Sequence, residues 1–142
     1  MSSDVHDRRR YPRFSIYCPI QYTAEGKRAM ERAITLNMSE GGAFISTHNL
    51  IGTGTALSLR LLLQDAYISV AGRVVHAIKE DRSNLSNIGV EFINRTSEYI
   101  NRFNKEIDAI TIYQRQSSDR NGREVSLAEA SLNWYLNSPV WI

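Results

Sequence analysis

The sequence predicts an all-β domain with added helices: a six-stranded antiparallel β-barrel, then a C-terminal amphipathic helix and a short helical tail. Two patterns carry this prediction. Up to residue 92, apolar residues alternate with polar ones in short runs separated by turn residues, at a spacing of about 10–15 residues. Beyond residue 96 the apolar spacing changes to 3 and 4, which is the period of a helix.

The first three strands lie close together near the N-terminus. Alternation over residues 16–23 predicts a strand with one buried face, and Gly26 marks the turn that follows. Residues 28–37 are expected to return as the second strand. Residues 38–42 are expected to form a loop, because paired glycines break either pattern, and a third strand follows over residues 43–47.

Three further strands complete the predicted barrel. Leucines at every second position over residues 57–63 predict the fourth, and residues 88–92 predict the sixth. The fifth covers residues 68–78, where Gly72 is expected to mark a bend or bulge. His76 falls on the apolar face of this strand, so we interpret it as a core histidine rather than a ligand.

The helix is expected to begin near Thr96 or Ser97 and to cover one end or face of the barrel. Its apolar stripe consists of Ile100, Phe103, Ile107 and Ile110. Residues 117–122 are expected to break it, and a capping box over residues 126–129 starts the tail helix. The chain is thereby divided into a flexible Arg-rich arm (1–13), a barrel with its packing helix (14–115), and a linker with a helical extension (116–142).

The composition is that of an ordinary globular protein, with 42% hydrophobic and 23% charged residues in a chain of 142. Nothing approaches the roughly 20 apolar residues that span a bilayer, and the first ten residues lack the apolar core of a secretory signal. The single cysteine, Cys18, is expected to be a small core residue and fits a reducing compartment. We therefore expect a cytoplasmic protein.

Two motifs flank the first strands of this scaffold. The first is an arginine cluster that contains an RRxxR spacing and consists of Arg8, Arg9, Arg10 and Arg13. Guanidinium groups match phosphate groups and base edges, so the cluster suggests an anionic, planar ligand. The second is an NxSxxG spacing over residues 37–42. Residues 1–10 contain a single aliphatic side chain, Val5, so we expect the arm to be mobile without ligand.

In this order, and followed by the Ile-Gly-Val-Glu-Phe strand and a helix, the two motifs resemble those of the PilZ domain family over about residues 8–112. The second motif has Asn where Asp is commoner. The resemblance implies a split β-barrel that binds the bacterial second messenger cyclic di-GMP, and no cofactor or metal is expected. Because the arm has so little apolar anchorage, we expect binding to order it against the barrel and so create a signalling surface.

The resemblance implies a role for each motif arginine. Arg9 and Arg13 would clamp guanine and phosphate groups, with Arg10 assisting. In this family a long basic residue before the first motif arginine goes with two stacked ligand molecules. Arg8 holds that position, which predicts an intercalated pair of cyclic di-GMP molecules.

The second motif would supply the remaining contacts. By resemblance, Asn37 would hydrogen-bond a guanine edge, and Ser39 a phosphate oxygen or a base edge. Gly42 would let the backbone approach the purine closely, and Gly41 belongs to the same ligand-binding set.

Other functions are less well supported by the sequence. No nucleophile elbow or paired metal-ligand spacing occurs, so an enzyme is not expected. A barrel that binds single-stranded nucleic acid is the stronger alternative, since Tyr11, Phe14 and Tyr17 lie beside the arginines. However, no basic stripe extends beyond the arm, so nucleic acid is the less favoured ligand. An adaptor that acts only through protein partners also remains open.

The C-terminal segment over residues 124–142 has two interpretations. It carries Trp134, Tyr135 and Trp141, the residue types that anchor interfaces. We slightly favour its folding back on its own barrel. The alternative is an exposed surface for a protein effector or for self-association. The downstream process is not determined by the sequence.

Overall fold

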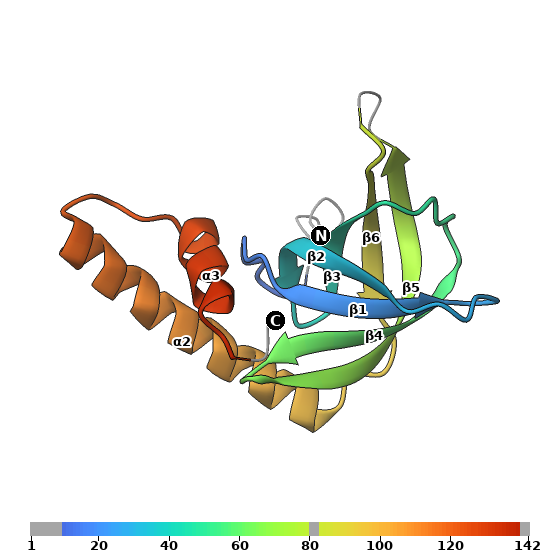
Figure 1. Ribbon diagram of the computed structural model, residues 1–142. Helices are drawn as coiled ribbons and strands as arrows, with labels where there is room; N and C mark the ends of the chain where they lie inside the picture. Colours follow the sequence, from blue (N-terminus) through green and yellow to red (C-terminus); the bar gives the residue numbers. More distant parts are fainter. Residues whose placement is uncertain (1–9, 80–82, 140–142) are drawn as a thin grey trace, which may run out of the picture.

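The computed structural model describes residues 10–79 and 83–139. Within these residues, six antiparallel strands form a closed barrel in the order β1-β2-β3-β6-β5-β4 (Figure 1), which confirms the predicted fold class. The strands are β1 (Pro19–Ala24), β2 (Glu31–Ser39), β3 (Gly42–Thr47), β4 (Ala56–Leu63), β5 (Ala66–Lys79) and β6 (Ser86–Phe92). The predictions for Arg8, Arg9 and Trp141 lie outside the described residues.

The interior of the barrel is filled by the apolar side of each alternating strand. Leu57, Leu59 and Leu61 of β4 are buried, while Ser58 and Arg60 between them are exposed. Burying one large aliphatic side chain stabilises the folded state by about 1.5–3 kcal/mol. Closure of the sheet leaves no long edge that could pair with another chain.

The first strand begins later than predicted because a threonine replaces part of the backbone pairing. Thr35 is fully buried, and its hydroxyl accepts from the backbone N–H of Cys18 at 2.8 Å and donates to the carbonyl of Ile16 at 2.7 Å. Residues 16–18 therefore pair with β2 through this side chain and a single backbone bond, from the N–H of Thr35 to the carbonyl of Cys18 at 3.0 Å, rather than through a regular ladder. Cys18 itself is buried in the core, as predicted.

A β-bulge in β2 decides which side chains face outward. Thr35 pairs with Ile45, whereas Asn37 pairs with Phe44, so one extra residue lies in β2 between the two pairs. The extra residue reverses the alternation, which buries Met38 and turns Asn37 to the outside. The predicted loop over residues 38–42 shrinks to the two-residue turn at 40–41, because the ladder between β2 and β3 continues as far as the pair of Ser39 and Gly42.

A second bulge, in β5, overturns two expectations. The register with β6 shifts between Val74 and His76, so His76 is exposed rather than in the core. Gly72 is not the irregular position, because it pairs regularly with Leu57 and Phe92. A side chain at Gly72 would instead collide with Leu59 and Val90, which explains the glycine.

Helix α2 (Ser97–Asn121) begins and ends at regular caps. The hydroxyl of Thr96 accepts from the backbone N–H of Tyr99 at 3.0 Å, and Gly122 adopts a left-handed φ of 67°. The predicted break over residues 117–122 is wrong, since the helix continues to Asn121. Its apolar stripe is buried as expected, except that Tyr99 is buried where Ile100 is only half-buried.

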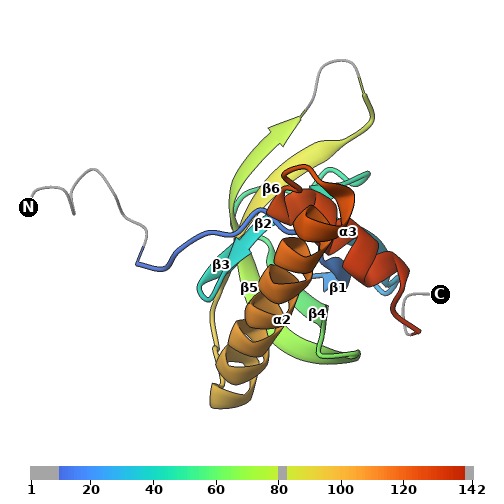
Figure 2. The ribbon, with the colours of Figure 1, turned by 90° about the vertical axis from the view of Figure 1, so that its left-hand side faces the viewer.

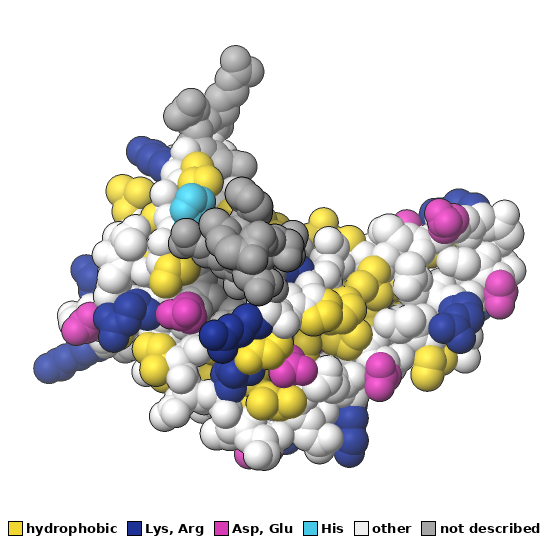
Figure 3. Space-filling view, turned by 180° about the vertical axis from the view of Figure 1, so that it is seen from behind, with side chains coloured by type: hydrophobic (Ala, Val, Ile, Leu, Met, Phe, Trp, Pro, Cys, Tyr) yellow, Lys and Arg dark blue, Asp and Glu magenta, His cyan; other side chains and the backbone are white. Residues whose placement is uncertain are grey.

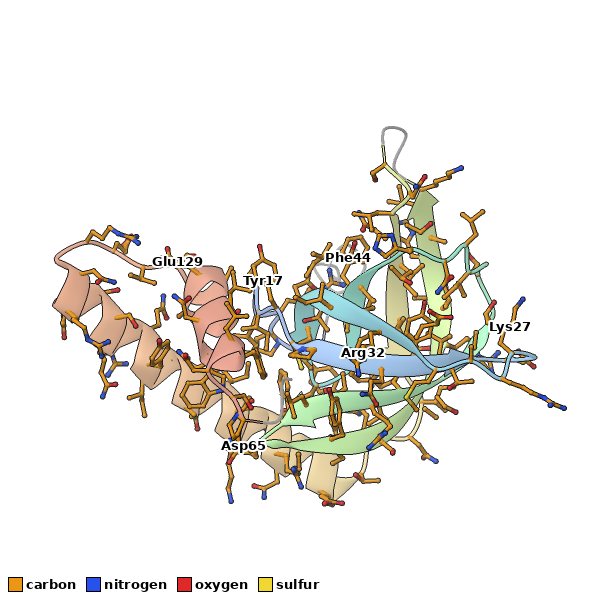
Figure 4. The ribbon with its side chains drawn as sticks, in the orientation of Figure 1. Tyr17, Lys27, Arg32, Phe44, Asp65 and Glu129 are labelled. Atoms are coloured by element: carbon orange, nitrogen blue, oxygen red, sulfur yellow. The ribbon has the colours of Figure 1, made fainter. Side chains whose placement is uncertain are left out.

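Helix α3 (Leu127–Leu136) folds back on α2 and on the barrel, as favoured (Figure 2). The hydroxyl of Ser131 accepts from the backbone N–H of Tyr17 at 2.9 Å, and Figure 4 shows Tyr17 beside this helix. Farther along, the hydroxyl of Ser138 donates to the carboxylate of Asp65 at 3.2 Å, in the turn between β4 and β5. The described part of the C-terminal extension, up to residue 139, thus belongs to the folded unit.

A buried carboxylate in α2 joins this helix to the barrel and to α3. Glu106 of α2 accepts from the side-chain amide of Gln64 at 2.9 Å and from the indole of Trp134 at 3.4 Å. Gln64 and Asp65 both have left-handed φ angles, as a two-residue hairpin turn requires.

In the described part of the chain, no helix combines the length and apolar character needed to cross a membrane.

Candidate functional site

A groove of about 910 Å³ lies where the N-terminal strap, residues 10–14, passes β2, β3, β5 and β6. Small-molecule sites commonly have volumes of roughly 300–1,000 Å³, so the groove is large enough for a nucleotide-sized ligand. Residues of both motifs line it together: Arg10, Arg13, Asn37, Ser39, Gly41 and Gly42. The fold therefore brings together every predicted site residue that it describes.

The strap is fixed to the barrel at its inner end. The backbone N–H of Phe14 donates to the carbonyl of Met38 at 2.9 Å, and the N–H of Met38 donates back at 3.0 Å. The Phe14 ring packs against Phe103 of α2, with centroids 6.1 Å apart. Arg13 is thus next to an anchored residue, while its exposed side chain is available to the groove.

The turn between β2 and β3 is held from two sides. The hydroxyl of Ser39 accepts from the backbone N–H of Gly41 at 3.1 Å, and the carbonyl of Ser39 accepts from the hydroxyl of Tyr99 at 3.0 Å. Burial raises the pKa of Tyr99 well above its usual range, so its hydroxyl remains a donor. The second motif therefore rests on helix α2.

A side chain would be obstructed by a different neighbour at each of the two motif glycines. A Cβ at Gly42 would lie 2.3 Å from the carbonyl oxygen of Val90 in the neighbouring strand, so packing between strands already requires glycine there. A Cβ at Gly41 would lie 2.9 Å from the ring of Tyr11, which covers this glycine. Close approach to a purine remains a prediction for Gly42.

Several residues of the groove were not predicted from the sequence. Arg95 follows β6, and its guanidinium carbon lies 4.6 Å from the centroid of the Tyr11 ring. His76 and Glu91 line the groove from β5 and β6, and Phe44 lines it from β3. Arg95, His76 and Phe44 belong to no recognisable motif, and Glu91 lies in the Ile-Gly-Val-Glu-Phe strand without having been expected at the site. Only the bulges and the strand pairing bring them to this surface.

Cys18 belongs to the core and is not among the residues that line the groove. Burial raises the pKa of the Cys18 thiol to about 12, so the thiolate nucleophile is scarce at neutral pH. Among the residues that the structure describes, no three His, Cys, Asp or Glu side chains could together hold a metal ion. On the face shown in Figure 3, dark blue Lys and Arg side chains lie beside magenta Asp and Glu side chains.

Comparison with known proteins shows which family the sequence matches and which solved structures share the fold. The PilZ domain family model matches residues 7–108. No curated protein matches the chain significantly. Among solved structures, the PilZ domain of YcgR from Escherichia coli with c-di-GMP has a TM-score of 0.56 at 14% identity, over 82% of this chain and 98% of that one.

Two longer proteins share the same fold. The MrkH–c-di-GMP complex of K. pneumonia has a TM-score of 0.62 at 17% identity, over 78% of this chain and 55% of that one. The inhibitor of motility MotI/DgrA of Bacillus subtilis has a TM-score of 0.61 at 18% identity, over 75% of this chain and 53% of that one. The chain spans about half the length of these two proteins. At such identities the likeness shows a shared fold.

Proposed function

The chain belongs to the PilZ domain family, and on that premise we propose that it is a non-catalytic receptor for cyclic di-GMP. The ligand would bind in the groove between the arginine strap and the β2–β3 turn. One observation carries the proposal: the described residues of the RRxxR and NxSxxG motifs, far apart in sequence, line a single groove. The YcgR and MrkH structures, both of which contain c-di-GMP, support the choice of ligand.

The chemistry of the groove suits such a ligand. A guanidinium such as that of Arg13 can meet O6 and N7 of a guanine with two hydrogen bonds, worth roughly 1–3 kcal/mol of discrimination. Arg9 would act with Arg13 on guanine and phosphate, and Arg10 would assist. The outward-facing Asn37 would bond a guanine edge, and Ser39 a phosphate oxygen or a base edge.

A titration of cyclic di-GMP tests this proposal. We expect the wild-type chain to bind, and the variants Arg9→Ala and Ser39→Ala to lose most of the affinity. Arg28→Ala and Ser58→Ala are matched controls, because both side chains are exposed and neither lines the groove. Absence of binding by the folded wild type would indicate an adaptor that acts only through protein partners.

The signal would come from the arm. We propose that ligand orders the N-terminal arm that precedes the anchored Phe14, and so forms a new surface for a protein effector. Amide hydrogen exchange of residues 5–14 should slow when ligand is added. Equal exchange rates with and without ligand would refute this step.

The stoichiometry is a separate proposal. Arg8 occupies the position that goes with two stacked ligand molecules in the family, so we propose an intercalated pair. Titration calorimetry should give two molecules of cyclic di-GMP per chain. One molecule of cyclic di-GMP per chain would show that Arg8 does not lead to a stacked pair in this protein.

Binding of single-stranded nucleic acid has weaker support. It would need aromatic side chains that are free to stack on bases. Phe14 packs instead against Phe103, and the Tyr11 ring contacts Arg95. An oligonucleotide affinity above that for cyclic di-GMP, with a steep salt dependence, would reverse this preference.

A further inference from the structure

Arg95 occupies a distinctive place in the groove. It lies between the end of β6 and the N-cap of α2, outside both motifs, and it lines the groove beside Arg10 and Arg13. Its guanidinium lies over the ring of Tyr11, which in turn covers Gly41 of the second motif. The side chain therefore contacts the strap and faces the same space as the motif residues.

The hydrogen-bonding capacity of Arg95 is largely unused. A guanidinium has five N–H donors. None of the hydrogen bonds found among residues 10–79 and 83–139 uses a side-chain donor of Arg95. Its ion pair with Glu40 spans 3.8 Å, which is too long for a hydrogen bond. Glu40 is itself bonded to Asn104 of α2 at 3.1 Å.

We propose that Arg95 is an additional ligand-binding residue, which donates its guanidinium N–H groups to a phosphate of the bound cyclic dinucleotide. The inference rests on the proposed function and adds a residue that neither motif contains. A phosphate is the expected partner because it carries a full negative charge, whereas a guanine edge offers only neutral acceptors.

The surroundings of Arg95 prepare it for this role. The side chain is only 29% exposed, so part of its desolvation cost is already met in the folded protein. Contact with the Tyr11 ring restricts the plane of the guanidinium, which reduces the entropy lost when a bidentate bond forms. The ion pair with Glu40 also restrains the group, at 3.8 Å, without saturating its donors. A ligand can therefore bind Arg95 without breaking a strong existing bond.

The experiment compares four variants of the full chain by calorimetric titration of cyclic di-GMP. Arg95→Ala removes the donors, and Arg95→Lys keeps the charge but not the planar fork. Glu40→Gln removes the ion pair and leaves Arg95 in place. Arg60→Ala is the matched control, because Arg60 also lies over a tyrosine ring, Tyr67, at 5.1 Å, but does not line the groove. Thermal unfolding of each variant checks that it is folded.

The proposal predicts a loss of affinity of about tenfold or more for Arg95→Ala, as expected for a hydrogen bond between charged groups. Arg95→Lys should lie between this variant and the wild type, and Glu40→Gln should bind as tightly as the wild type or more tightly. If folded Arg95→Ala binds like Arg60→Ala, or if Glu40→Gln loses as much affinity, the proposal is wrong while the receptor function stands. No binding by the wild type would refute both.

Discussion

The hydroxyl of Tyr99 donates to the carbonyl oxygen of Ser39 at 3.0 Å and so joins the first turn of α2 to the end of β2. The Tyr99 ring is fully buried, stacked on Phe103 and in edge contact with Phe92. A rigid part of the core therefore supports the turn that carries the second motif. This relationship makes the position of the turn depend on the helix.

Tyr99→Phe should lower both stability and ligand affinity. Removing the hydroxyl leaves the Ser39 carbonyl without this partner, which should reduce the free energy of unfolding by about 0.5–1.5 kcal/mol in urea denaturation. Affinity for cyclic di-GMP should fall by a few-fold, because the turn is less well held. Tyr113→Phe is the control, since the Tyr113 hydroxyl joins none of the hydrogen bonds of the described residues. Equal effects of the two changes would contradict the argument.

The two motif glycines should differ in how much stability is lost when each is replaced by alanine. Gly42→Ala places a Cβ against the carbonyl of Val90 at 2.3 Å, and overpacking of this kind typically costs about 1–3 kcal/mol of unfolding free energy. Gly41→Ala brings its Cβ mainly against the side-chain ring of Tyr11, which can shift more easily than a strand carbonyl, so its cost should be below about 0.5 kcal/mol. Urea denaturation of the two variants checks this order. A more destabilising change at Gly41 would show that the strap is part of the core.

Alkaline pH should destabilise the protein through Cys18. Burial raises the pKa of this thiol from 9.0 to about 12, so the unfolded chain releases the proton more easily than the folded one. The stabilisation is complete below pH 9 and declines as the pH rises toward the folded value. Urea denaturation at increasing pH should show this decline, and Cys18→Ala should show a smaller one. Burial also raises the pKa values of Tyr99 and Tyr135, so the alanine variant should retain some dependence at alkaline pH.

The C-terminal helix should contribute to the stability of the barrel. Ser131→Ala removes the acceptor for the backbone N–H of Tyr17, which lies 2.9 Å from the hydroxyl. Because this N–H is part-buried, we expect a loss of about 1–2 kcal/mol of unfolding free energy. Asn133→Ala, on the exposed side of the same helix, should change stability much less. If both variants were as stable as the wild type, α3 would be only loosely attached to the barrel.

Errors in the sequence prediction cluster at the bulges. Alternation is a local property, and it correctly placed Leu59, Val70 and Ile88 in the core. A bulge inserts one residue without a local signature, because it depends on which residue of the neighbouring strand forms the next pair. His76 was therefore assigned to the wrong face. The extension of α2 to Asn121 was missed because the polar residues of its last turns carry no apolar stripe.

The amino-acid sequence by itself determined the order of strands and helices and the two motifs, since apolar period, turn residues and motif spacing are all local properties of the chain. Only the tertiary structure decided that Arg13 and Asn37 share a groove, that Arg95 joins them, and that Tyr99 supports the turn below. These relationships depend on strand register and on the closing of the barrel, which bring together residues that are distant in the chain. Contacts of that kind arise from packing the whole core, and no short stretch of sequence records them.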